Sequence, residues 1–243
     1  MRDYAKELEK RVSFIRGLLA ESHADGIVFG NSGGKDSALV GILCKKACDN
    51  TVGILMPCHS KRNFGIDLDD GCALAESFGI ELRQFDLTPC RKAVVDMLSS
   101  EVELSDAALA NIAPRLRMTT LYTIGAAENR LVAGTGNKSE IYMGYFTKWG
   151  DGANDFNPIA DLTVTEVYEF LEYLGAPRSI IEKAPSAGLF EGQTDEQEMG
   201  VTYAAIDKYM ETGEASAHDK EIIDRYHARS EHKRNMPKFY SDN

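Results

Sequence analysis

The first part of the chain carries apolar residues at helical spacing. Residues 4–20 place an apolar stripe on one face, which predicts an amphipathic helix; its members are Tyr4, Leu8, Val12, Ile15 and Leu19. A capping-box spacing at Thr163 and Glu166 predicts the start of a later helix, which ends where Gly175 and Pro177 follow Leu174.

Short apolar runs between these helices predict strands. They lie at residues 26–30, 51–56, 80–85 and 130–134. Helical stretches separate them, at 38–46 and 67–78 and, as two segments, over roughly 90–128. Strands that alternate with helices predict an α/β fold with a doubly wound, mostly parallel sheet flanked by helices.

Residues 185–200 have three glycines and little periodicity, and we interpret them as a mobile, lid-like loop. We see no repeat and no low-complexity linker, so we expect one domain over residues 1–243.

Composition narrows the classes of function. The 243 residues carry 27 Lys and Arg against 38 Asp and Glu, a net charge of −11, which argues against a nonspecific nucleic-acid binder. No apolar run approaches the roughly 20 residues of a membrane span, and the N-terminus has no secretory signal. The five cysteines form no CxxC pair, which favours reduced structural thiols. We therefore expect a cytoplasmic protein that binds neither nucleic acid nor membrane.

The most informative motif is the turn between the first predicted strand and its helix. It reads Ser32-Gly33-Gly34-Lys35-Asp36-Ser37. Glycines let the backbone approach a ligand closely, and the N–H groups and dipole of a helix N-terminus favour an anion, so the sequence predicts a phosphate site. It is not a Walker A loop, because Lys35 is followed by Asp36 and no glycine stands at position 29.

This turn resembles the SGGxDS loop of the ATP pyrophosphatase (PP-loop) superfamily, which binds the pyrophosphate end of ATP and transfers AMP. Further blocks resemble NAD⁺ synthetase, in family order over about residues 26–237. They are residues 134–140, 144–155, 185–196 and 230–237. The resemblance implies that a nicotinate carboxylate of deamido-NAD⁺ is adenylated by ATP, with release of pyrophosphate, and that ammonia then displaces AMP.

The resemblance also implies roles for individual residues. Mg²⁺ would be held by Asp36 and Glu140, and Ser32, Asp36 and Lys148 would serve catalysis. The residues expected to bind ATP are Gly30, Asn31, Ser32, Gly33, Gly34, Lys35, Asp36, Ser37, Thr135, Val164 and Ser186. Those expected to bind deamido-NAD⁺ are Arg115, Lys148, Asp155, His232 and Lys233.

Two positions depart from the family pattern. Val164 stands where the family usually has a lysine that touches ATP phosphate, and valine offers neither charge nor donor. Lys35 or Lys183 is a candidate to compensate, and adding Lys at 164 should then leave the Michaelis constant for ATP nearly unchanged. Ser186 replaces a common threonine and keeps the hydroxyl.

The resemblance implies a homodimer. The stretch before the first strand is too short for the amidase domain of glutamine-using members, so free ammonia is the expected nitrogen donor, with an amidotransferase on a separate chain as the alternative source. Two alternatives remain. One is another PP-loop ligase or thiolase, and the other is a nucleotide sensor that has lost turnover, which Val164 favours and an intact Asp36 and Glu140 disfavour.

Overall fold

The computed structural model describes residues 2–60, 63–183 and 194–241. Its strands are β1 (Gly26–Gly30), β2 (Thr51–Leu55), β3 (Glu81–Gln84) and β4 (Arg130–Ala133). Its helices are α1 (Tyr4–Ser22), α2 (Lys35–Ala47), α3 (Ile66–Phe78), α4 (Thr88–Ser99), α5 (Asp106–Ala110), α6 (Ile112–Glu128), α7 (Lys138–Met143), α8 (Val164–Leu174), α9 (Arg178–Ile181), α10 (Asp195–Met199), α11 (Tyr203–Thr212), α12 (Ala217–Arg229) and α13 (Glu231–Arg234).

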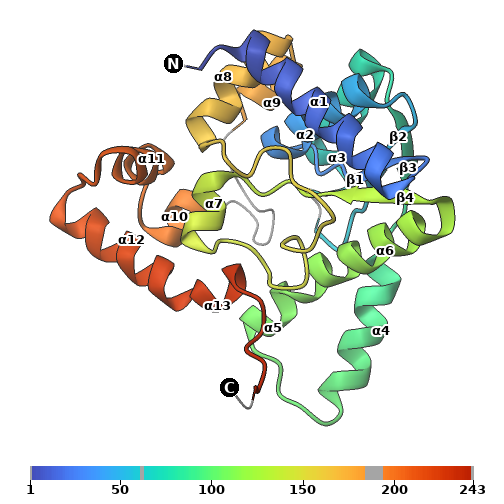
Figure 1. Cartoon of the computed structure of the whole chain (residues 1–243). Coiled ribbons are helices and arrows are strands. Elements are labelled where there is room, and N and C mark those ends of the chain that lie inside the picture. Colours follow the sequence, from blue (N-terminus) through green and yellow to red (C-terminus); the bar gives the residue numbers. More distant parts are fainter. Residues whose placement is uncertain (1, 61–62, 184–193, 242–243) are drawn as a thin grey trace.

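The four strands form one parallel sheet in the order β3-β2-β1-β4 (Figure 1). The chain moves from β1 outward to β3 and then returns past β1 to β4. This reversal makes the sheet doubly wound, as the sequence predicts, and it places a switch point between β1 and β4.

Alternate residues of the strands face two separate apolar layers. Ile27 and Phe29 of β1 pack with α1, α2 and α8, whereas Val28 lies with Val52 and Val132 on the face that α6 covers. Because both faces of the sheet are buried, the central strands are apolar throughout rather than alternating.

A third apolar cluster lies away from the sheet, among the C-terminal helices. Met143 of α7 packs there with Val164 of α8, Tyr203 and Ile206 of α11, and Ile223 of α12. In Figure 1, α11 and α12 belong to the orange and red part of the chain, beside α7. They bring the segment after α12 back toward the loops that follow β4.

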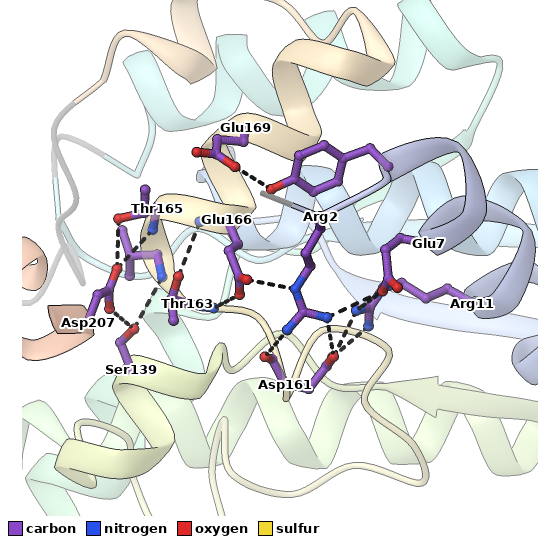
Figure 2. A network of polar contacts seen from close by, with 12 residues as sticks. Arg2, Glu7, Arg11, Ser139, Asp161, Thr163, Thr165, Glu166, Glu169 and Asp207 are labelled. Carbon is purple, nitrogen blue, oxygen red and sulfur yellow. Dashed lines mark hydrogen bonds and ion pairs between the residues drawn. The ribbon is translucent and has the colours of Figure 1, made fainter. Parts of the chain in front are cut away.

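Polar contacts fix the start of α1 and the start of α8 to each other (Figure 2). Arg11 is 8 % exposed and donates to both carboxylate oxygens of Asp161, while Arg2 donates to Asp161 and Glu166. On the other side of α8, Asp207 of α11 accepts hydrogen bonds from Ser139 and Thr165. The first turn of α7 is therefore held by both α8 and α11.

The structure confirms the predicted strands and most of the predicted helices. It differs over residues 90–128, where three helices lie instead of two, because Ser105 caps the additional short α5. It also differs at 195–199, where a capping box of Thr194 and Gln197 starts α10 inside the segment predicted as a loop. The rest of that predicted lid, up to residue 193, lies outside the described residues. No helix in the described part of the chain is long and apolar enough to cross a membrane.

Candidate active site

A cavity of about 1070 Å³ opens beyond the carboxyl ends of β1 and β4. Its wall combines the loop after β1, the loop after β4, one face of α6 and the segment that follows α12. In a doubly wound sheet this switch point is where ligands bind. The cavity therefore lies where the fold favours a ligand site.

The loop after β1 forms an anion cradle. Gly33 has a φ of +69°, and a Cβ there would lie 2.1 Å from the backbone oxygen of Asp67, so only glycine fits. Helix α2 then begins at Lys35 with Gly34 as its N-cap, and no side chain among the described residues caps it. Its first N–H groups are left to a ligand, and the dipole of this helix favours negative charge there.

Two serines shape this loop. The Ser32 and Ser37 hydroxyl oxygens lie 3.0 Å apart, and Ser37 Oγ accepts from the Ser32 N–H at 3.2 Å and donates to the Gly34 carbonyl at 3.0 Å. Asn31, at the end of β1, donates to the Gly71 carbonyl of α3 at 2.9 Å and accepts from Gly33 N–H. These bonds hold the predicted ATP-binding loop in one conformation against α3.

Asp36 and Glu140 are brought together although 104 positions separate them in the chain. Asp36 Oδ2 accepts from Lys35 Nζ at 2.6 Å, and Glu140 Oε1 lies 3.8 Å from the same ammonium. The buried Asn137 donates to Asp36 Oδ1 at 3.0 Å and forms a reciprocal capping box with Glu140. The first turns of α2 and α7 thus place the two predicted metal ligands in one cluster on the cavity wall.

This cluster favours a bound cation. Burial and the Asp36 carboxylate raise the pKa of Glu140 well above its ordinary value, and Lys35 lowers it only in part. Two carboxylates from different elements suit Mg²⁺, which is held in proteins by one or two carboxylates together with substrate phosphates and water. The residues present therefore fit the metal, with the phosphate cradle beside them. Among the described residues there is no group of three carboxylates, histidines or cysteines that would hold a metal by protein ligands alone.

The other predicted ATP residues lie in different places. Gly30 and Thr135 line the cavity, as do Lys35 and Lys183, the two candidates to compensate for Val164. Lys183 Nζ donates to Asp67 at 3.0 Å and to Asp70 at 2.7 Å, so it is bound to α3 in this structure. Ser186 lies outside the described residues.

Val164 lies in an apolar core and not on the described cavity wall. It is 4 % exposed and packs in the cluster of α7, α8, α11 and α12, while its N–H donates to Ser139 Oγ. A buried valine at the first position of α8 needs no charge to be explained. Val164 was the feature that favoured a nucleotide sensor without turnover, and packing in the apolar core explains this valine.

The far side of the cavity carries cations. His232 and Lys233 both line it, and Lys233 Nζ donates to the carbonyls of Gly144 at 2.7 Å and Phe146 at 2.6 Å. Burial lowers the pKa of Lys233. The segment after α12 lies close to α7 because residue 144 is a glycine. A Cβ at this position would lie 2.0 Å from the Cβ of Ser230.

Three of the residues predicted to bind deamido-NAD⁺ do not line the cavity in the described part of the chain. Arg115 is exposed on α6. Lys148 Nζ donates to the His232 carbonyl at 2.6 Å, which supports a residue that does line the cavity. Asp155 accepts from the Val132 N–H at 2.8 Å and so covers the free edge of β4. Their roles in binding stay predictions.

Arg117 is the cation that α6 does present to the cavity. It donates to the Met56 carbonyl and to Asn63, both at 3.2 Å, and no carboxylate in the described part of the chain lies within ion-pair distance. Burial lowers its pKa. Helical spacing could have identified Arg117 in the sequence. Pro114, Arg117 and Leu121 share the face of α6 that lines the cavity, whereas Arg115 lies on another face.

The fold and this geometry define a nucleotide-binding α/β protein with a phosphate loop and a carboxylate pair beside it. The profile of the NAD synthase family matches residues 7–243. The chain belongs to the NAD synthase family, whose members are carbon–nitrogen ligases.

Named relatives agree with this assignment. The NH₃-dependent NAD⁺ synthetase of Carboxydothermus hydrogenoformans is 48 % identical over 238 residues, which cover 97 % of each chain. That of Archaeoglobus fulgidus is 43 % identical over 245 residues, covering 97 % of this chain and 96 % of the relative.

Solved structures are similar over the whole length. NMN synthetase from Francisella tularensis superposes with a TM-score of 0.93 at 37 % identity, with 99 % of both chains covered. NH₃-dependent NAD synthetase from Campylobacter jejuni, solved with a nitrate ion, gives a TM-score of 0.81 at 30 % identity, covering 99 % of this chain and 100 % of the other. This assignment leaves no place for the alternative of a thiolase or of a ligase from another PP-loop family.

Proposed function

We propose that this chain catalyses the ATP-dependent amidation of deamido-NAD⁺ to NAD⁺ with free ammonia, the last step of NAD⁺ synthesis. The observation that carries the proposal is the pairing of an uncapped, glycine-built helix N-terminus with the Asp36 and Glu140 carboxylates in one cavity. The relatives named NH₃-dependent NAD⁺ synthetase, which this chain covers almost completely, support ammonia as the nitrogen donor.

The reaction has two balanced steps. A carboxylate oxygen of the nicotinate group attacks the α-phosphorus of ATP, the bond to the β-phosphate oxygen breaks, and pyrophosphate leaves. Ammonia then attacks the carbonyl carbon of this acyl-adenylate, AMP leaves with the electrons of the C–O bond, and the nitrogen loses a proton. The obstacle in the first step is the approach of two anions.

The loop residues supply what that step requires. The backbone N–H groups at the start of α2 and the Ser32 and Ser37 hydroxyls would bind the departing pyrophosphate. Asp36 and Glu140 would hold Mg²⁺, which when bound neutralises phosphate charge and orients the triphosphate. Thr135, which lines the cavity, would contact ATP from the loop after β4.

The substrate would lie toward the cations on the other side of the cavity. Arg117 and Lys233 line this wall, and a guanidinium suits the diphosphate of a dinucleotide. His232 lies next to Lys233, and Lys148 holds the His232 carbonyl. We assign Lys148 to the support of this wall, Asp155 to the support of β4, and Arg117 to a direct phosphate contact.

Nicotinate mononucleotide is a second candidate substrate, because the Francisella tularensis structure is that of an NMN synthetase. Its nicotinate carboxylate would undergo the same two steps. The two substrates differ by the adenylate half of the dinucleotide, so only a comparison of rates separates them.

One experiment tests the proposal. Purified protein is supplied with ATP, Mg²⁺ and either deamido-NAD⁺ or nicotinate mononucleotide, with and without ammonium, while pyrophosphate and the amidated product are measured. We expect NAD⁺ and pyrophosphate in equal amounts only when all components are present, with kcat/KM higher for deamido-NAD⁺. A higher kcat/KM for nicotinate mononucleotide would show that this mononucleotide, and not deamido-NAD⁺, is the substrate. ATP binding without formation of either product would support the alternative of a nucleotide sensor.

We also propose that the chain forms a homodimer. Helix α4 has no buried residue; Met97 and Leu98 in its last turn are 65 % and 37 % exposed, and Val102, three residues after the helix ends, is 53 % exposed. Exposed apolar side chains on one helix are typical of an interface. Sedimentation equilibrium of the wild type and of Met97→Glu should give a dimer and a weakened dimer, whereas a monomeric wild type would refute this.

A further inference from the structure

Lys35 occupies an unusual place for a lysine. It is the first residue of α2, where the positive end of the helix dipole disfavours a cation, and it is only 7 % exposed. Its ammonium lies 5.7 Å from the centre of the Tyr203 ring. A buried lysine at a helix N-terminus requires compensation by nearby anions.

That compensation comes from the carboxylates assigned to the metal. Lys35 Nζ lies 2.6 Å from Asp36 Oδ2 and 3.8 Å from Glu140 Oε1. The two carboxylates come from α2 and α7, so the ammonium bridges the two elements that make the metal site. With both carboxylates ionised, one positive charge beside two negative charges gives these three side chains a net charge of −1.

We propose that Lys35 is an internal counter-ion that weakens metal binding to Asp36 and Glu140 until a nucleotide is bound. The inference rests on the metal site of the proposed function. A divalent cation that approaches the two carboxylates is repelled by an ammonium a few ångströms away in a poorly hydrated site. When a nucleotide binds, its phosphates at the neighbouring N–H groups add negative charge beside the metal ion and the Lys35 ammonium, so the two cations no longer compete for the same two carboxylates.

The consequence is that metal and nucleotide bind cooperatively. If the metal binds better when the nucleotide is present, the nucleotide must bind better by the same factor when the metal is present. Lys183 is not expected to affect metal binding in this way. Its carboxylate partners, Asp67 and Asp70, both belong to α3 and are not the proposed metal ligands.

The test measures Mn²⁺ binding to the protein without nucleotide, from the EPR signal of free Mn²⁺. Lys35→Met removes the charge and keeps the length of the side chain, and we expect it to tighten Mn²⁺ binding at least about tenfold. Lys45→Met is the matched control, because Lys45 lies on the same helix and pairs with Asp49 at 3.7 Å. Its Mn²⁺ affinity should equal that of the wild type.

A double variant locates the effect. Lys35→Met combined with Glu140→Gln should lose the gain, and Mn²⁺ should raise the melting temperature of Lys35→Met more than that of the wild type. Unchanged or weaker Mn²⁺ binding by Lys35→Met would overturn the proposal. If that variant fails to fold, Lys35→Gln gives the same comparison with a neutral donor.

A second measurement separates this proposal from the metal site on which it rests. With a non-hydrolysable ATP analogue present, the wild type should bind Mn²⁺ at least about tenfold more tightly than Glu140→Gln. Equal affinities would refute the metal site itself. A clear difference there, together with an unchanged Lys35→Met, would refute only the role of Lys35.

Discussion

Two charged clusters join distant parts of this chain, and the pKa of Glu140 in one shifts in the opposite direction to the pKa values of Glu7 and Asp161 in the other. In the cavity, the Lys35 ammonium faces Asp36 and Glu140, and burial together with Asp36 raises the pKa of Glu140. Around α1, guanidinium groups face Glu7, Asp161 and Glu166 (Figure 2).

In the cluster around α1, hydrogen bonds and charge from Arg11 outweigh burial and lower the pKa of Asp161, and Arg11 likewise lowers that of Glu7. The Arg11 guanidinium donates hydrogen bonds to both Glu7 and Asp161, whereas the Lys35 ammonium is hydrogen-bonded to Asp36 and lies 3.8 Å from Glu140. The cluster around α1 therefore stabilises the fold. The cluster in the cavity retains negative charge that a ligand cation would satisfy, which is typical of a functional site.

The largest expected effect is on catalysis. Asp36→Asn keeps the side-chain oxygen toward Asn137 but removes the charge, and we expect the rate of NAD⁺ formation to fall about 10³-fold, since such electrostatic groups contribute about that much. The free energy of unfolding should fall by about 2 kcal/mol, because the buried Lys35 loses its nearest carboxylate and keeps only Glu140. Steady-state kinetics and urea unfolding measure the two effects. Asp69→Asn, an exposed carboxylate of α3, is the control, and a loss below tenfold for Asp36→Asn would contradict the assignment.

The phosphate loop could be predicted from the sequence because it is local. The segment from Ser32 to Ser37 carries its own glycines, hydroxyls and carboxylate, and the strand and helix that flank it follow from apolar patterns. The pairing of Asp36 with Glu140 depends on β1 and β4 being neighbours. The resemblance to a known family implied this pairing, whereas spacing alone did not.

The opposite wall of the cavity was predicted less well because it is assembled from distant segments. Arg117 lines the cavity in place of the predicted Arg115 because of which face of α6 lies toward it, and that is set by packing on β1 and β4. The position of Lys233 depends on α12 returning to α7. At Val164, the family resemblance indicated that a lysine bound to phosphate is missing. The apolar core formed with the C-terminal helices explains the valine instead.

Val164 therefore gives the next largest effect, on stability. Val164→Lys would place an ammonium in an apolar core, and we expect a loss of about 3 kcal/mol in the free energy of unfolding. The Michaelis constant for ATP should stay nearly unchanged at a temperature where the variant is folded. A lower Michaelis constant with unchanged stability would instead place this side chain at the phosphates.

Arg11→Met tests the cluster around α1. Arg11 donates to Glu7, Asp161 and the Pro158 carbonyl, so its removal should cost about 2 kcal/mol of unfolding free energy at pH 7 and leave kcat within twofold. The pKa values of Glu7 and Asp161 are lowered in the folded state, so their contribution is present above the ordinary carboxyl pKa and is lost as pH falls through the folded values. The difference between wild type and variant should therefore shrink below about pH 4. A difference that is constant from pH 7 to pH 3 would show that packing, not charge, is lost.

The smallest effect isolates one bond at the edge of the same cluster. Thr163 Oγ1 accepts from the Glu166 N–H at 3.2 Å, and the Glu166 carboxylate accepts in return from the Thr163 N–H at 2.9 Å while it also binds Arg2. Thr163→Ala removes only the first of these bonds, so it should cost about 1 kcal/mol, the usual contribution of an N-cap, with no change in kcat. Thr123→Ala is the matched control, because this exposed hydroxyl of α6 donates only to a carbonyl of its own helix. Urea unfolding of both variants decides the matter, since equal losses would mean that the capping box adds nothing and that Arg2 and Arg11 alone hold the start of α8.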